Sequence, residues 1–293
     1  KYGIKIVPTK EASWAGVRDK LVNGELDMAH VLWGLIYGVH MGTAGPRKDM
    51  AILMNLNHNG QAITLSKEAK VITVPPPQMV ANMRVGNMDG YCVGEPWNHR
   101  AIADGIGITA ATTQDVWKDH PEKALGTTAD FVKKYPNTCR AVIMAILEAG
   151  KWIDAGLQNK LKMAETVADK AYVNTSVDVI NQRILGRYQN GLGKTWDDPN
   201  HMKFFNDGYV NYPYLSDGMW FLTQHKRWGL LKEHPDYLGV AKSINQTELY
   251  KQAASGVKVS VPKDPMRSSK MIDGVTWDGK DPAKYADAFK VKA

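Results

Sequence analysis

The chain has 293 residues, of which 44% are hydrophobic and 23% charged, a composition typical of a folded globular protein of one large or two ordinary domains. Its net charge of +7 comes from Lys and Arg residues that are spread along the chain without a cluster, which argues against nucleic acid as a partner. Two isolated cysteines exclude a disulfide framework and predict no zinc site, and there is no apolar run of eighteen residues that would span a membrane.

The first elements that the sequence predicts are a strand, a helix and a second strand. Residues 3–8, GIKIVP, form an apolar run between Gly and Pro and are expected to be a strand. Ser13 offers an N-cap to an amphipathic helix that ends at Gly24, and the apolar segment 26–33 follows as the second strand. Because strands joined by a helix commonly run parallel, this unit predicts a parallel sheet.

The same order of elements recurs about sixty residues later in the chain. A Gly-x-x-Asp-x-x-x-Val pattern begins at Gly24 and again at Gly86. The second copy predicts a strand near 71–77, a helix at 78–87 and a strand at 88–94. We therefore expect two related strand–helix–strand units, one in each of two lobes.

The remaining chain completes an α/β fold. Two apolar runs follow the first unit, separated by an Asn-Gly turn at 59–60. From Thr128 the pattern becomes helical, and from Trp196 it predicts irregular segments and helices that pack onto the earlier sheets. The expected architecture is two lobes with parallel sheets and a ligand cleft between them.

Three helix starts are expected to face that cleft. They lie at Ser13, at Pro75 and at Pro96, and proline is well tolerated in the first turn of a helix. A helix N-terminus presents backbone N–H groups and a partial positive charge, so these positions favour an anionic ligand.

The sequence contains no recognisable catalytic pattern. GLGKT at 191–195 is not a phosphate-binding loop, because that motif requires glycine at the position of Tyr188. Asp27 and Asp89 occupy matched positions after a glycine turn, which favours a structural role over acid–base catalysis. We expect a protein that binds without turnover, with no catalytic residue, cofactor or metal site.

Five segments in combination resemble the solute-binding proteins of the nitrate and bicarbonate ABC transporters. They are KEASW, NGQAITLS, VPPPQMVANMRVGNMDG, GYCVGEPWN and YPYLSDGMWFLTQHKRWG, which start at residues 10, 59, 74, 90 and 212. The resemblance runs over nearly the whole chain. It implies a two-lobed periplasmic-binding-protein fold of type II that closes over one small anion and delivers it to a membrane permease in nitrate assimilation.

The resemblance also implies where the lobes begin and end. Lobe one would comprise residues 1–65 and 126–293, and lobe two residues 66–125. The family has several tens of residues more between NGQAITLS and VITVPPP, including a histidine that touches the anion. We therefore expect lobe two to be shortened here, or the sequence to omit segments after Glu68, and that histidine has no counterpart among these residues.

Site residues are carried over from the resemblance one at a time. The indole of KEASW would pack on the anion beside two helix N-terminal amides, NGQAI would supply a side-chain amide, and CVGEPW would supply backbone contacts. The structural alternatives are a Trp that covers a helix start, a polar residue at a strand edge and a tight turn. The predicted ligand-binding residues are Trp14, Ala15, Gly16, Gln61, Val93, Gly94 and Lys123.

Lys123 distinguishes the members of the family. Nitrate-binding members resemble this chain in having lysine there, whereas bicarbonate-binding members have a glutamate associated with calcium. A buried lysine would donate charge-assisted hydrogen bonds to nitrate. The structural alternative is a solvated lysine in a charged turn.

These features together predict an extracytoplasmic, periplasmic receptor for nitrate, with nitrite as a second ligand. Its partners would be the permease subunits of an ABC importer, with membrane contact only through the permease or an upstream anchor. Three alternatives remain open. They are a receptor for bicarbonate or a sulfonate, a nitrate sensor that signals without transport, and an enzyme like the related thiamin-pyrimidine synthases.

Overall fold

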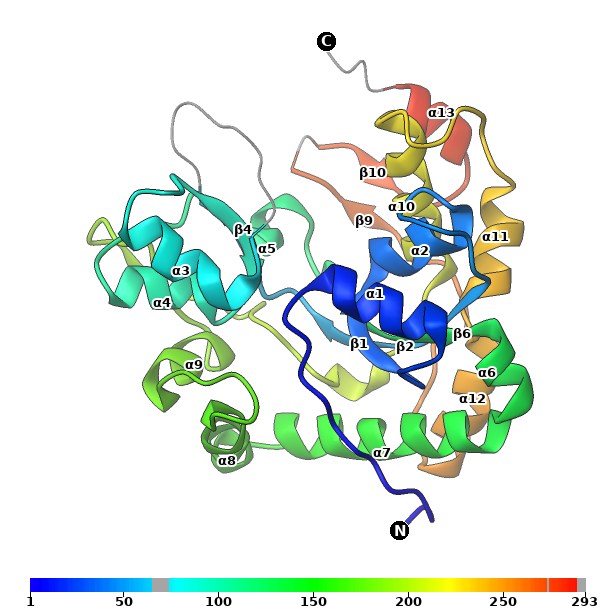
Figure 1. Ribbon diagram of the computed structural model, residues 1–293, viewed down its shortest axis with the longest axis horizontal. Helices are drawn as coiled ribbons and strands as arrows, with labels where there is room; N and C mark the ends of the chain where they lie inside the picture. Colours follow the sequence, from blue (N-terminus) through cyan, green and yellow to red (C-terminus); the bar gives the residue numbers. More distant parts are fainter. Residues whose placement is uncertain (65–73, 273, 289–293) are drawn as a thin grey trace.

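The computed structural model describes residues 1–64, 74–272 and 274–288, with backbone alone for 61–64 and 77. The chain forms two lobes of unequal size, and helix α7 (Pro136–Asp154) extends along the base of lobe one toward the segment that lies below lobe two (Figure 1). The two-lobed α/β architecture predicted from the sequence is confirmed.

Lobe one is built on a three-stranded sheet in the order β1-β6-β2. Its strands are β1 (Ala29–Leu32), β6 (Pro121–Thr128) and β2 (Met50–His58), and β6 runs antiparallel to both neighbours. Helices α1 (Trp14–Asn23) and α2 (Trp33–Met41) pack against this sheet. Their apolar side chains share one buried cluster with the sheet, which makes lobe one the larger core.

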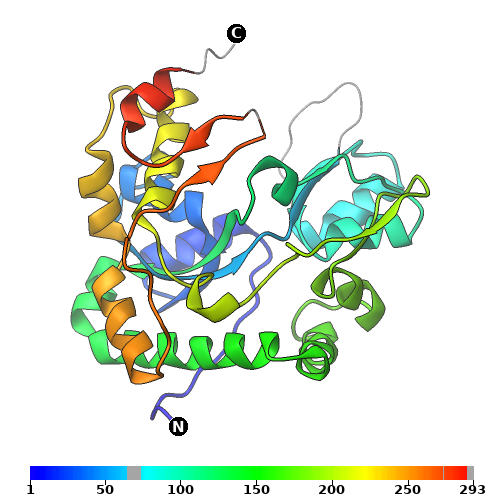
Figure 2. The same cartoon turned by 180° about the vertical axis from the view of Figure 1, so that it is seen from behind.

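The second half of the chain adds most of its helices to lobe one. Figure 2 shows from behind that the last helices lie on the side of lobe one that faces away from lobe two, whereas the C-terminal hairpin lies on the side toward lobe two. These elements are α6 (Ala129–Lys134), a 3₁₀ turn (Asn206–Gly208), α10 (Leu215–Arg227), α11 (Tyr237–Ile244), α12 (Thr247–Gly256), β9 (Ser269–Lys270), β10 (Thr276–Trp277) and α13 (Pro282–Asp287).

Lobe two has a sheet in the order β4-β3-β5, with β4 (Tyr91–Gly94), β3 (Gln61–Thr64) and β5 (Ala111–Thr112). Its helices are α3 (Pro76–Arg84), α4 (Trp97–Ala103) and α5 (Thr113–Val116). As predicted, prolines occupy the first turn of α3, and Pro96 is the N-cap of α4.

The chain returns to lobe two after α7, which the sequence did not predict. Helix α9 (Val177–Ile184) packs against α4. Strands β7 (Arg187–Gln189) and β8 (Thr195–Asp197) form a hairpin beside the lobe. The hairpin is bonded to lobe two, because the Thr109 N–H donates to the Asn190 carbonyl at 3.2 Å. Helix α8 (Leu157–Ala168) joins α7 to this unit. The segment 157–197 therefore belongs beside lobe two, not to the lobe-one part 126–293.

Two predictions about strands are wrong. Residues 3–8 form no strand in the structure. Every strand pair in the described sheets is antiparallel, whereas parallel sheets were expected. The reason is non-local, because β6 lies between the co-directional strands β1 and β2, and β3 lies likewise between β4 and β5.

The repeated sequence pattern is confirmed as a repeated structure. Helix α1 ends at Gly24 and α3 is followed by Gly86, with left-handed φ angles of 78° and 76°, values that glycine adopts without strain. In each lobe the strand that follows buries its valine against the central strand, since Val31 pairs with Ala124 in β6 and Val93 pairs with Ala62 in β3. Of the first predicted strand of the second copy, 71–77, residues 71–73 lie outside the described residues, and residues 74–77 form no strand but lead into α3.

Three of the segments that pass between the lobes are linked by hydrogen bonds of Asn59. The Asn59 N–H donates to the His120 carbonyl at 2.9 Å, and the His120 N–H donates to Asn59 Oδ1 at 3.1 Å. The Asn59 side chain also donates to the Asn200 carbonyl at 3.0 Å. The first two crossings therefore lie near 59 and 120, a few residues upstream of the predicted boundaries at 65/66 and 125/126.

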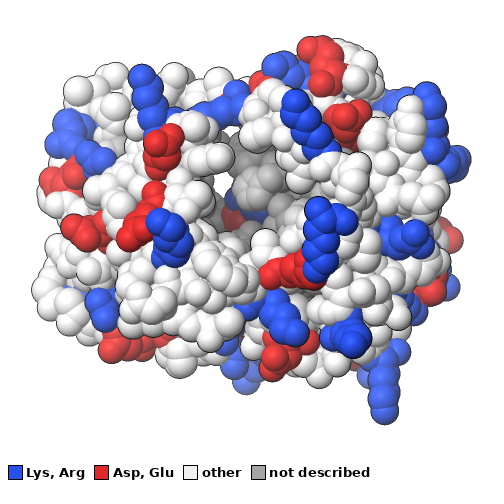
Figure 3. Space-filling view, turned by 90° about the horizontal axis from the view of Figure 1, so that it is seen from below, with Lys and Arg blue, Asp and Glu red and all other residues white. Residues whose placement is uncertain are grey.

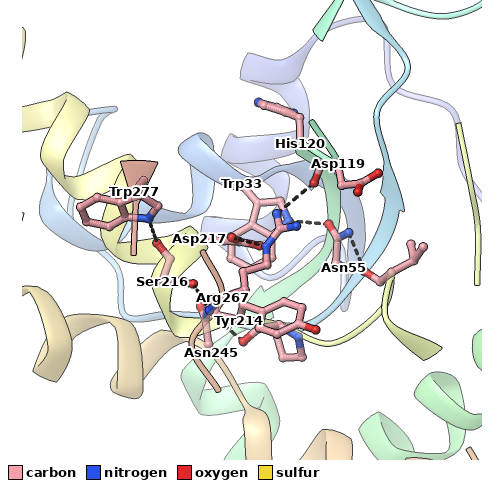
Figure 4. Close-up of polar contacts among 12 residues, drawn as sticks. Trp33, Asn55, Asp119, His120, Tyr214, Ser216, Asp217, Asn245, Arg267 and Trp277 are labelled. Carbon is pink, nitrogen blue, oxygen red and sulfur yellow. Dashed lines mark hydrogen bonds and ion pairs between the residues drawn. The ribbon is translucent and has the colours of Figure 1, made fainter. Parts of the chain in front are cut away.

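A buried polar network attaches the C-terminal segment to lobe one (Figure 4). The Arg267 Nε donates to Asp217 at 2.7 Å, and its Nη2 donates to the carbonyl of Asp119 at 2.9 Å, beside the second crossing. The Trp277 indole donates to the Ser216 carbonyl at 2.9 Å. The prediction that the C-terminal segment packs onto the earlier sheets is confirmed for the described residues.

Candidate ligand-binding site

Four of the seven predicted site residues, two from each lobe, line one cavity of about 390 Å³. Trp14 and Lys123 come from lobe one, and Val93 and Gly94 come from the end of β4 in lobe two. The face seen from below is hollowed between the lobes, and basic and acidic side chains are interspersed around it (Figure 3). The size and position of this cavity fit a cleft for a small ligand.

Lys123 lies in the centre of the site, on the central strand of lobe one. Its side chain is only 8% exposed, so the alternative of a solvated lysine is wrong. The Nζ atom lies 5.3 Å from the centroid of the Trp14 ring, within the range of a cation–π contact. A cation and an indole face are thus presented together to the cleft.

The Lys123 ammonium is ion-paired with the buried carboxylate of Glu122. Glu122 also accepts a hydrogen bond from Asn57 Nδ2 at 3.1 Å. Adjacent residues of a regular strand point to opposite faces, but the register of β2 against β6 is irregular on either side of Asn57, opposite Lys123. The site is therefore close to neutral when empty, which the sequence analysis missed.

Gly94 lets the two lobes approach each other closely. A Cβ atom at this position would lie 3.4 Å from Lys123 Nζ and 3.4 Å from a Glu122 carboxylate oxygen, tighter than most contacts. The Val93 carbonyl accepts a hydrogen bond from the Asn98 side chain at 2.7 Å, and the valine side chain is buried. Of the two predicted backbone positions, Gly94 is the one that adjoins the cation.

The start of α1 is capped by Ser13, as the sequence predicts. The Gly16 N–H donates to Ser13 Oγ at 3.1 Å, so this amide is engaged inside the helix. The predicted contribution of α1 to an anion therefore remains with the Ala15 amide and the Trp14 ring, which lie in the same first turn.

Gln61 is the first residue of β3 and pairs through its backbone with Gly94. This pairing places its backbone at the edge of the cleft. The side chain lies outside the described residues, so the predicted amide donor stays a prediction.

His30 of β1 also lines the cleft, although it was not singled out from the sequence. His30 is exposed to the cleft, although protein surrounds its ring on the other sides. The loss of water around the ring lowers the pKa of His30 to about 4, and the positive charge of Lys123 is the second cause. The alternation in AHVL carried the signal, because the neighbour Val31 faces the core and His30 must face away from it.

The residues described by the structure contain no group of three or more His, Cys, Asp or Glu side chains placed to hold a metal ion. Within the same residues, no helix combines the length and apolar character needed to cross a membrane. The cleft presents the Lys123 ammonium with its Glu122 partner, the Trp14 indole and the backbone at Gly94.

Comparisons with known proteins agree with the geometry. The model of the NMT1-like family matches residues 1–70 and 66–168. The nitrate/nitrite binding protein NrtA of Synechocystis sp. PCC 6803 is 33% identical over 357 aligned positions, which cover 100% of this chain and 80% of NrtA. Because the alignment is longer than this chain, NrtA has segments that this sequence lacks.

Two further comparisons cover a solved structure and a bicarbonate-binding relative. The crystal structure of the periplasmic nitrate-binding protein NrtA from Synechocystis PCC 6803 superposes with a TM-score of 0.89 at 31% identity, covering 96% of this chain and 89% of that one. The bicarbonate-binding protein CmpA of Synechococcus elongatus is 30% identical, over 77% of this chain and 53% of CmpA.

Proposed function

The chain belongs to the NMT1-like family, and we propose that it is an extracytoplasmic solute-binding receptor for nitrate, with nitrite as a second ligand. It delivers the anion to the permease of an ABC importer and catalyses no reaction. Its location is periplasmic, and it meets the membrane through the permease or through an anchor upstream of Lys1. The relatives that bind nitrate and nitrite support this assignment.

The observation that carries the proposal is the buried Lys123 ammonium between Trp14 and Gly94. Transfer of an anion out of water is costly unless charged or polar donors replace its hydration. A buried ammonium donates charge-assisted hydrogen bonds, which are about twice as strong as neutral ones. The Trp14 ring offers a flat apolar surface that matches the planar face of nitrate.

Closure of the lobes completes the site in this proposal. Lys123 and Trp14 belong to lobe one, whereas Gly94 belongs to lobe two, and the crossings at Asn59 and His120 lie between them. A rotation about these crossings brings the Gly94 strand end against the bound anion and changes the outer surface that a permease meets.

Bicarbonate is the second candidate, and the Glu122 carboxylate is the observation that favours it. Glu122 lies beside Lys123 and can only accept hydrogen bonds when it is ionised. Bicarbonate has a hydroxyl group to donate to such a carboxylate, whereas nitrate has none. The two anions are therefore distinguished by whether Glu122 helps or hinders binding.

Isothermal titration calorimetry with nitrate, nitrite and bicarbonate tests the proposal. We expect nitrate to bind with a Kd on the order of micromolar and, at millimolar concentration, to stabilise the fold by about 4 kcal/mol. Lys123→Glu should abolish nitrate binding. The matched control is Lys118→Glu, which makes the same charge change at an exposed position five residues away and should leave nitrate binding unchanged.

A charge-neutral double variant separates binding from folding. Glu122→Gln combined with Lys123→Gln removes both members of the buried pair, so no unpaired charge remains to destabilise the fold. This protein should fold and fail to bind nitrate. Absence of both heat and thermal stabilisation with nitrate in the unmodified protein would refute the proposal, and a preference for bicarbonate that Glu122→Gln removes would establish the second candidate.

A further inference from the structure

A second cavity of about 310 Å³ lies behind the anion position, on the side of α8 and α9. It shares His30, Gly94, Glu95 and Lys123 with the cleft, but most of its wall is apolar, and the segment that returns to lobe two contributes half of the lining residues. The apolar side chains of that segment are Met163, Val167, Val173, Ile180, Ile184, Met202 and Phe204.

The cavity is much larger than an inorganic anion requires. Its volume is roughly ten times the ~30 Å³ that one water molecule occupies in the liquid. Pockets of this size are typical of sites for small organic molecules. An apolar wall also gains nothing from nitrate, which is polar on all sides.

One buried cation on the wall of this cavity is only partly paired. Arg183, on α9, is 1% exposed, and its Nη1 and Nη2 atoms make no hydrogen bond to the residues that the structure describes. Its Nε lies 3.1 Å from a Glu95 carboxylate oxygen as an ion pair, and its guanidinium carbon lies 4.2 Å from the Tyr188 ring centroid.

These contacts hold the guanidinium in place but leave its outer nitrogens without acceptors. Glu95 engages the Nε side and Tyr188 covers one face of the plane, so Nη1 and Nη2 of Arg183 are left to face other groups. Burial of the four N–H groups of Nη1 and Nη2 without acceptors is costly, because these donors lose water and gain no hydrogen bond in return. Two parallel N–H groups match the two oxygens of a carboxylate.

We propose that this Arg183 pocket is a second ligand site that takes a short-chain aliphatic carboxylate. The carboxylate oxygens accept hydrogen bonds from the Arg183 guanidinium, and a tail of a few carbon atoms lies on Val167, Ile180 and Met202. The proposal does not depend on nitrate, because the head group and the apolar wall both belong to the returning segment 157–204 rather than to Trp14.

Calorimetry with three probes tests the pocket. Hexanoate has both the head group and the tail, acetate has the head group alone, and 1-hexanol has the tail without the charge. We expect hexanoate to bind, and acetate and 1-hexanol to bind at least tenfold more weakly. If all three give equal heats, binding does not need both the charge and the tail, and if hexanoate gives no heat, the pocket does not bind it; either result overturns the proposal.

Two variants locate the bound hexanoate. Arg183→Gln should weaken hexanoate at least tenfold, and the control Arg187→Gln, at an exposed residue of the adjacent strand, should leave it unchanged. Val167→Phe fills the apolar wall without touching any charge, so it should also abolish hexanoate binding even if Arg183→Gln does not fold.

Nitrate binding provides an independent readout of these variants. The Val167→Phe protein should keep the affinity for nitrate of the unmodified protein, because Val167 does not line the cleft around Trp14. If Lys123→Glu abolishes hexanoate binding while Val167→Phe and Arg183→Gln both retain it, hexanoate binds in the nitrate cleft and the proposal is overturned.

Discussion

The two lobes contain the same local unit, but the hydrophobic cores that support this unit differ greatly in size. In each, a helix ends at a left-handed glycine and a short strand buries a valine against the strand that crosses between the lobes. In lobe one this valine joins an extensive cluster that spans the sheet and several helices. In lobe two the described residues give it only Met88, Tyr91 and Ala101 as fully buried partners.

This difference shows that a repeated sequence pattern specifies local geometry but not stability. Lobe two is completed from elsewhere, because α9 packs on α4 and Arg183 pairs with Glu95 at the turn before α4. Lobe one places the Lys123 ammonium at the cleft, and lobe two contributes Gly94 and Glu95 at the end of β4 together with an apolar wall. We expect the two lobes to differ accordingly in how they respond to mutation.

The largest difference is expected from the buried ion pairs. Glu95→Gln leaves Arg183 buried and uncompensated in lobe two, and Asp217→Asn leaves Arg267, which is 16% exposed, in lobe one. Each should cost about 3 to 5 kcal/mol. Hydrogen exchange should show local opening of α4 and α9 for Glu95→Gln but global destabilisation for Asp217→Asn. Equal exchange patterns would mean that the lobes unfold as one unit.

The next effect is a dependence of stability on pH. Burial lowers the pKa of His120, at the crossing, to about 4 from an ordinary value of 6.5. Between pH 6.5 and pH 4 the imidazole is protonated in the unfolded chain but not in the folded chain. The free energy of unfolding is therefore highest above pH 6.5 and falls as the pH is lowered toward 4. The expected loss is about 3 kcal/mol for this residue.

Thermal unfolding from pH 7.5 to pH 4 measures this loss in the unmodified protein and in His120→Gln. The substitution should flatten the profile, because Gln does not titrate in this range. His99 in lobe two has its pKa lowered to about 4 as well, mainly by burial, so His99→Gln is the matched variant. A profile that neither substitution changes would show that other groups set the acid stability.

A smaller contrast is expected from the paired valines. Val31→Ala should cost about 2 kcal/mol, because Val31 is 0% exposed within the large cluster. Val93→Ala, at 5% exposure in the small cluster, should cost about 1 kcal/mol and loosen lobe two locally. Urea unfolding measures both. A larger global cost for Val93→Ala would reverse our ranking of the two cores.

The smallest effect should be equal in the two lobes. Gly24 and Gly86 have nearly the same left-handed φ, and a Cβ atom at either position would meet no atom within 4 Å. Substitution by alanine should therefore cost only the backbone strain of about 1 kcal/mol at each. Chemical denaturation of Gly24→Ala and Gly86→Ala checks this, and a difference above about 1 kcal/mol would show that the two turns are not equivalent.

Local signals in the sequence predicted much of this molecule. Three features could be predicted because each depends on residues only a few positions apart in the sequence. They are the N-cap Ser13, the prolines that open α3 and the repeated Gly-to-Val spacing. Trp14, Gly94 and Lys123 were found through family resemblance, and the structure brings them to one cavity.

The parts that were missed depend on contacts far apart in the sequence. The central position of β6 between β1 and β2 follows from pairing across most of the first lobe, so no local pattern indicates it. The pairing of Lys123 with Glu122 follows from an irregular register, and Arg183 reaches Glu95 across 88 positions of sequence. Helical periodicity could predict α9, but not the lobe to which it attaches.

The hydrogen bonds of Asn59 have a mechanical consequence. This one residue cross-links three of the chain segments that run from lobe to lobe, through His120 and Asn200. Segments bonded side by side at one place cannot slide past one another, but they can still twist together. The hydrogen bonds of Asn59 therefore limit the relative motion of the lobes mainly to a rotation about this place. Such a rotation changes the outline of the molecule as the cleft opens or closes, and a partner protein can recognise that change.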